Sequence, residues 1–111
     1  MQMIILVVRD LFMKVKIQDM AKSLETELIS RTNIDGIKEA LEKHNISQII
    51  IDLNLDKALD LVKELKKFSQ VKIVGFCGHT EIALIKEAKS LGVEVYVRSV
   101  FFEKLNEILI G

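Results

Sequence analysis

The chain has 111 residues, half of them apolar, and equal numbers of acidic and basic side chains. This length suits a single domain, residues 1–111, and the balanced charge provides no basic surface for nucleic acid. The apolar opening run is too short to cross a bilayer, and the single Cys cannot form an internal disulfide. We therefore expect a cytoplasmic protein with no membrane or nucleic-acid partner. Its many Lys and Glu residues are a feature of proteins from thermophiles.

Short apolar runs alternate with helical periodicity along the chain. The first run, residues 3–8, is continuously apolar and predicts a buried strand. The next apolar positions recur at steps of four, three and four, which predicts a helix; they are Met13, Ile17, Met20 and Leu24. Further strands, each followed by helical periodicity, are predicted at residues 26–30, 47–53, 71–77 and 93–99.

Capping residues mark several predicted helix ends. Asn33 or Asp35 can cap the second helix, and Thr80 can cap the fourth. Gly92 lies where the C-terminal cap of the fourth helix belongs. The last helix is predicted from Phe102 onward.

Five strand–helix repeats predict an α/β fold. Strands buried on both faces and joined by helices form a parallel sheet. Five of them in this length predict a three-layer, doubly wound, flavodoxin-like domain with strand order 2-1-3-4-5. In such sheets the site lies beyond the carboxyl ends of the strands. The residues expected at that edge are Arg9, Asp10, Asp52, Cys77, Gly78, His79, Arg98 and Ser99.

Four stretches resemble the receiver domains of two-component response regulators. "ILVVRD" is similar to a first strand ending in an acidic pair, and "NIDGIKEALE" to the opening of the second helix. "IIIDLNL" is similar to the strand that presents the phospho-accepting Asp, and "VEVYVRSVF" to the fifth strand with its switch aromatic, Lys-Pro and Phe. The resemblance implies that Asp52 is the phosphoacceptor position, Asp10 the retained half of the acidic pair and Tyr96 the switch aromatic. It also implies a Mg²⁺ site on Asp10, Asp52 and the backbone carbonyl of Asn54.

The sequence departs from the receiver pattern at four positions. The family's first acid, switch Ser/Thr, Lys and Pro are replaced by Arg9, Cys77, Ser99 and Val100. A fixed cation at Arg9 repels a metal, Ser99 donates only a neutral hydrogen bond, and Cys77 is a poor donor. We therefore expect no required cofactor, weak Mg²⁺ binding at most, and a degenerate receiver that does not depend on phosphorylation. One hypothesis is that Arg9 pairs permanently with Asp52 or Asp10.

The resemblance also implies a role in protein binding. Receivers bind dimer partners through the face of the fourth helix, fifth strand and fifth helix, where Tyr96, Phe101 and Phe102 would form a contact patch. We expect a protein partner or a homodimer on this face, and no enzymatic activity. The alternative is that both Phe side chains are covered locally.

Other interpretations stay open. A divergent but working receiver would be phosphorylated on Asp52. A small flavodoxin-like enzyme or ligand-binding protein would use Asp10, Asp52, Cys77 and His79. A fold like that of anti-sigma-factor antagonists also has an apolar strand followed by Asp-Leu, although the five regular repeats count against it. Structural roles are open too: Asp10 can cap a helix, Arg9 can lie at the rim, and Cys77 can be a small buried apolar residue.

Overall fold

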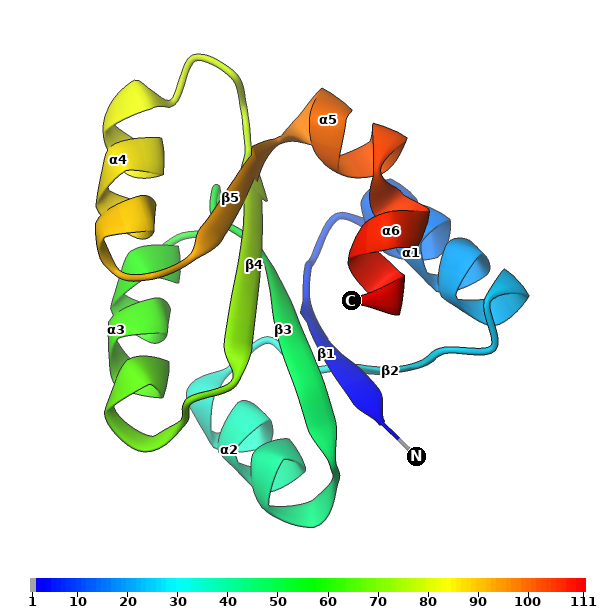
Figure 1. Cartoon of the computed structure of the whole chain (residues 1–111). Helices are drawn as coiled ribbons and strands as arrows, with labels where there is room; N and C mark the ends of the chain where they lie inside the picture. The colour runs from blue at the N-terminus through cyan, green and yellow to red at the C-terminus, as the bar shows by residue number, and fades with distance from the viewer. Residues whose placement is uncertain (1) are drawn as a thin grey trace.

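The computed structural model describes residues 2–111; Met1, the first residue of the predicted domain, lies outside this range. Five parallel strands form one sheet in the order β2-β1-β3-β4-β5 (Figure 1). The strands are β1 (Met3–Val7), β2 (Glu27–Ser30), β3 (Ile46–Asp52), β4 (Lys72–Cys77) and β5 (Glu94–Val97). The helices are α1 (Leu11–Ser23), α2 (Ile34–Lys43), α3 (Ala58–Phe68), α4 (Ile82–Ser90), α5 (Arg98–Glu103) and α6 (Leu105–Ile110). The predicted strand order and doubly wound α/β fold are confirmed.

Helices cover both faces of the sheet. Helices α2, α3 and α4 pack on one face, and α1, α5 and α6 pack on the other, which gives three layers (Figure 1). In β3, Ile49 and Ile51 pack on the side of α2 and α3, whereas Ile50 packs on the side of α1. All three are fully buried, and each such burial contributes roughly 1.5–3 kcal/mol. Among residues 2–111, no helix is both long and apolar enough to span a membrane.

The helix ends follow the predicted caps in part. Asn33 caps α2, because its Oδ1 accepts the backbone N–H of Gly36 at 2.7 Å. Gly92 follows the C-cap of α4 with a φ of +85°, a conformation that favours glycine. Thr80 does not cap α4. The N-cap is Glu81, whose N–H bonds to the Gly78 carbonyl at 3.2 Å, so Thr80 is taken up in the preceding turn.

The fifth strand ends two residues earlier than predicted. Cys77, the last residue of β4, pairs with Val97, so no neighbouring strand is left to pair with Arg98. The chain therefore turns into α5 at Arg98 and Ser99. The last helix is also divided, because α5 and α6 meet at Lys104. Arg98 thus lies in the first turn of a helix, immediately beyond the carboxyl edge of the sheet.

Candidate functional site

Asp52 is the last residue of β3 and lies at the carboxyl edge of the sheet. It is only 5% exposed, and its Oδ1 accepts the backbone N–H of Asn54 at 2.9 Å. The turn after β3 therefore folds back onto the carboxylate. A buried carboxylate is costly to ionise unless nearby groups compensate its charge.

Asn54 joins the ends of three strands. Its side-chain Oδ1 accepts the backbone N–H of Gly78, just past β4, at 3.1 Å. The same oxygen accepts a hydrogen bond from Nη2 of Arg98, just past β5, at 3.2 Å. Because Asn54 itself follows β3, this one amide ties together the carboxyl ends of β3, β4 and β5.

Arg98 is the cation that acts on Asp52. Burial raises the pKa of Asp52 above its ordinary value of 3.8, and the negative charge of Asp10 raises it further. The hydrogen bond from Asn54 and the positive charge of Arg98 lower the pKa, but they do not overcome burial. Arg98 therefore stabilises the ionised form of a carboxyl group that its surroundings otherwise keep protonated to a higher pH.

Arg9 does not reach this carboxylate. It is exposed, and it makes no ion pair within residues 2–111. Asp10 is exposed as well and caps α1, since its Oδ1 accepts the N–H of Met13 at 3.0 Å. The predicted permanent pairing of Arg9 with Asp52 or Asp10 is therefore wrong. The chain leaves β1 at Val7 and turns directly into α1, which leaves Arg9 on the rim.

Cys77 belongs to the core. It is fully buried among apolar side chains, and this burial raises the pKa of its thiol, so its reactive thiolate form is disfavoured. His79 and Ser99 are exposed. Over residues 2–111, no three His, Cys, Asp or Glu side chains are grouped so that they could hold a metal ion. The charge of Asp52 acts on both Asp10 and Cys77, but the buried thiol of Cys77 is disfavoured as the nucleophile that the enzyme interpretation needs.

The Mg²⁺ site implied by the resemblance to receivers fits these residues poorly. Mg²⁺ requires near-octahedral oxygen ligands. One carboxylate oxygen of Asp10 accepts a helix-capping bond, and one of Asp52 accepts the Asn54 N–H. The charge of Arg98 already acts on Asp52 and would repel a second cation. The charge of Arg98 thus opposes the ion, while one oxygen of each carboxylate takes no part in these hydrogen bonds.

The aromatic residues do not form the predicted contact patch. Phe101 is fully buried and stacks on Phe76 with ring centroids 4.5 Å apart, so it cannot touch a partner. Phe102 is half-buried and lies under Lys16 of α1, 4.7 Å from its Nζ, and thus on the α1 side of α5. Tyr96 is partly exposed, and its hydroxyl donates to Glu94 at 3.1 Å. Of the three predicted residues, only Tyr96 stays available for the face of α4, β5 and α5.

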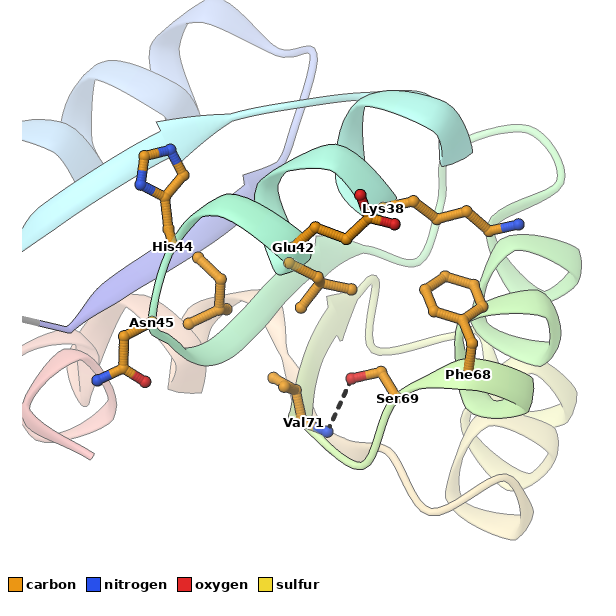
Figure 2. Close-up of a pocket in the computed structure, with 9 residues that line it drawn as sticks. Lys38, Glu42, His44, Asn45, Phe68, Ser69 and Val71 are labelled. Atoms are coloured by element: carbon orange, nitrogen blue, oxygen red, sulfur yellow. Dashed lines mark hydrogen bonds between the residues drawn. The ribbon is translucent and has the colours of Figure 1, made fainter.

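A cavity of about 580 Å³ lies at the opposite edge of the sheet, between the C-terminal ends of α2 and α3 (Figure 2). Lys38 lies over the ring of Phe68, 4.7 Å from its centroid, and the Ser69 Oγ accepts the N–H of Val71 at 3.1 Å. None of the residues predicted for the site lines this cavity.

Neither family models nor curated proteins match the sequence, but solved structures match nearly the whole chain. The isolated REC domain of RcsB from Salmonella enterica serovar Typhimurium is 17% identical with a TM-score of 0.80, covering 99% of this chain and 85% of that one. The N-terminal signal receiver domain of a two-component response regulator from Bacteroides fragilis is 21% identical with a TM-score of 0.80, covering 99% and 94%. The chain has the fold of response-regulator receiver domains.

The phosphorylated cyanobacterial phytochrome response regulator RcpA shares this receiver fold. It is 18% identical with a TM-score of 0.73, and the match covers 97% of this chain and 91% of that one. Identities this low establish the fold alone. The five-stranded receiver topology also replaces the fold of the anti-sigma-factor antagonists as an interpretation of the chain.

Arg98 is the site residue to which the sequence pattern assigns no role. Its signal is its place one residue before Ser99, which holds the receiver family's Lys position. If residues 93–99 are all taken as strand, Arg98 and Ser99 point to opposite faces of the sheet, and Arg98 is not expected at the site. Whether Arg98 or Ser99 serves the crevice depends on where the strand ends, and the strand ends at Val97.

Proposed function

We propose that this chain is a receiver-like signalling domain that acts by binding another protein and does not depend on phosphorylation of Asp52. The observation that carries the proposal is the position of Arg98. Its guanidinium bonds to Asn54 at 3.2 Å, and its charge favours the ionised form of Asp52. A permanent cation of the chain itself thus acts on this carboxylate, although the two side chains form no direct ion pair within residues 2–111.

The crevice formed by Asp52, Asn54 and Arg98 is poorly suited to regulated phosphorylation. The carboxylate must be accessible and ionised to act as a nucleophile, and donors must stabilise the charge that develops on the phosphoryl oxygens. Asp52 is 5% exposed with a raised pKa. Ser99 brings no charge, and the buried Cys77 is a weak donor. These features support a crevice that is held in one state by its own side chains.

The proposed activity is binding in the cytoplasm, without catalysis. The partner is a protein or a second copy of the chain, docked on the face of α4 and β5. Tyr96 is partly exposed on β5, and Ile82 at the start of α4 is 64% exposed. These two side chains would supply the apolar part of the interface with the partner.

A second candidate is a divergent receiver that is still phosphorylated on Asp52. It is favoured by the electrostatic influence of Asp10 on Asp52, which means that two carboxylates still act on one another at the carboxyl edge. The same fold occurs in the phosphorylated regulator RcpA.

A titration followed by ¹⁵N–¹H NMR separates the two candidates. The protein is titrated with Mg²⁺, and then with Mg²⁺ plus beryllofluoride, which mimics an aspartyl phosphate. We expect the amide signals of Asp52 and Asn54 to stay in place at millimolar Mg²⁺. Shifts that begin there and spread to Cys77, Ser99 and Tyr96 would establish the working receiver instead. The variant Arg98→Gln sharpens the test, because removal of the resident cation should increase any response to Mg²⁺.

A further inference from the structure

A second pocket adjoins the crevice on the side of α1. Its volume is about 390 Å³, and it lies between α1, the loop after β4 and the start of α5. Lys16, His79 and Arg98 line it, one from each of these segments, and Ser99 adds a hydroxyl group. No acidic side chain lines it in the described part of the chain. Cationic and hydroxyl donors on a wall that carries no carboxylate of its own are the chemistry that recognises an anion.

Lys16 is held at this pocket without an acidic partner. Its Nζ lies 4.7 Å from the centroid of the Phe102 ring, a contact that favours a cation. Within residues 2–111 it forms no salt bridge. Phe102 and Val97 supply apolar surface to the same pocket. One part of the pocket wall is therefore positively charged and another part is apolar.

Arg98 has unused capacity for hydrogen bonds. Its Nε is buried and has no hydrogen-bond partner between residues 2 and 111. Its Nη2 is held by the Asn54 amide at 3.2 Å, and that amide oxygen also accepts the N–H of Gly78. A guanidinium carries five hydrogen-bond donors. An anion in the pocket can therefore bind Arg98, and the most that Arg98 gives up is its hydrogen bond to the neutral Asn54 amide.

We propose that this pocket binds a small phosphate monoester, with the phosphate group on Lys16, Arg98 and Ser99 and the organic group against Phe102. The size of the pocket favours a monoester over the bare ion, since 390 Å³ falls in the range of small-molecule sites. Inorganic phosphate shares the recognised chemistry and serves as the simplest probe.

Occupation of the pocket also affects Asp52. The guanidinium that would bind the phosphate is the one that bonds to Asn54 and acts on Asp52. An anion on Arg98 competes for it, which loosens the crevice. The binding itself is independent of the proposed function, whereas this consequence rests on it.

The test is an NMR titration with inorganic phosphate and then with glycerol 3-phosphate, both at constant ionic strength maintained with chloride. We expect saturable shifts at Lys16, His79, Arg98 and Ser99, with tighter binding of the monoester. Equal affinities would assign the free ion as the ligand and overturn the monoester assignment. Absence of saturable shifts at millimolar concentrations of both compounds would overturn the proposal as a whole.

Charge-removal variants make the test specific. Lys16→Gln and Arg98→Gln should each weaken binding roughly tenfold, the effect of losing one charge-assisted hydrogen bond. Lys22→Gln is the matched control, because Lys22 is an exposed residue of α1 that does not line the pocket. If Lys22→Gln weakens binding as much as Lys16→Gln, the attraction is diffuse and the pocket is not the site. Beryllofluoride is read at Asp52 and Asn54, and phosphate is read at Lys16 and His79, which the first titration does not use. Either proposal can therefore fail while the other stands.

Discussion

Two arginines border the carboxyl edge of the sheet, one after β1 and one after β5. Arg9 lies in a loop between a strand and a helix that begins with an Asp10 cap, and it is exposed. Arg98 lies in the first turn of α5, bonds to Asn54 and acts on Asp52. The same side-chain type at the same edge thus has two different roles.

The two arginines differ in the helix that each one leads into. After Arg9 the chain enters α1 with Leu11 and Phe12, which are 70% and 86% exposed and leave this end of the helix on the surface. After Arg98 it enters α5, which is fixed by the fully buried Phe101 three residues on. Arg98 is therefore followed by a helix that starts against the core, whereas Arg9 is followed by a helix whose first residues are exposed.

The largest expected effect comes from removing that anchor. Phe101→Ala should lower the free energy of unfolding by about 3–5 kcal/mol, the usual cost of deleting a buried Phe side chain. The matched control is Phe12→Ala at the start of α1, where we expect a change within about 0.5 kcal/mol. Urea unfolding followed by circular dichroism measures both. Similar losses in the two variants would contradict the contrast between α1 and α5.

A smaller effect is expected at the amide that joins the strand ends. Asn54→Ala leaves the Gly78 N–H and Arg98 without their acceptor, and should destabilise the fold by about 1 kcal/mol. The amide signals of Gly78 and Arg98 should shift, whereas that of Arg9 should not. An Asn54→Ala protein with unchanged stability and signals would mean that the three strand ends are not coupled through this residue.

Asp52→Asn should increase the free energy of unfolding, in contrast to the substitutions above. Because the pKa of Asp52 is raised in the folded protein, the folded state holds the proton more tightly than the unfolded state does. The wild type therefore loses stability as the pH rises from about 3.8 through the raised pKa, and above it the full penalty applies. At neutral pH the variant should be about 1 kcal/mol more stable, and the gain should vanish in acid.

Urea unfolding over a pH series measures this gain. Asp56→Asn is the control, since Asp56 is an exposed aspartate in the same loop, and its replacement should give a smaller difference. A gain for Asp52→Asn that is largest in acid would contradict the sign that the raised pKa predicts.

The smallest effect is expected at the rim. Arg9→Gln should change the free energy of unfolding by less than about 0.5 kcal/mol, because the side chain is exposed and makes no ion pair among the described residues. The amide signals of Asp52 and Asn54 should not move. A clear shift at Asp52 would place Arg9 in the crevice after all.

The sheet could be predicted from the sequence because burial imposes a pattern on it. Ile49, Ile50 and Ile51 are continuously apolar since both faces of β3 are covered. The position of Asp52 followed from the same pattern, since it is where the apolar run ends. The partner of Asp52 could not be predicted in this way. Which of Arg9 and Arg98 reaches the carboxylate depends on where each strand stops and on the packing of the next helix, and neither leaves a periodic signal.

The central claim, that Arg98 is the counter-charge of Asp52, is tested most directly by the pKa of Asp52 itself. Carboxyl ¹³C NMR over a pH series can follow Asp52 in the wild type, in Arg98→Gln and in Arg9→Gln. If Arg98 is the counter-charge, its removal should raise the pKa of Asp52 further, and Arg9→Gln should leave it at the wild-type value. An unchanged pKa in Arg98→Gln, or an equal rise in both variants, would contradict the claim that one specific arginine holds this crevice.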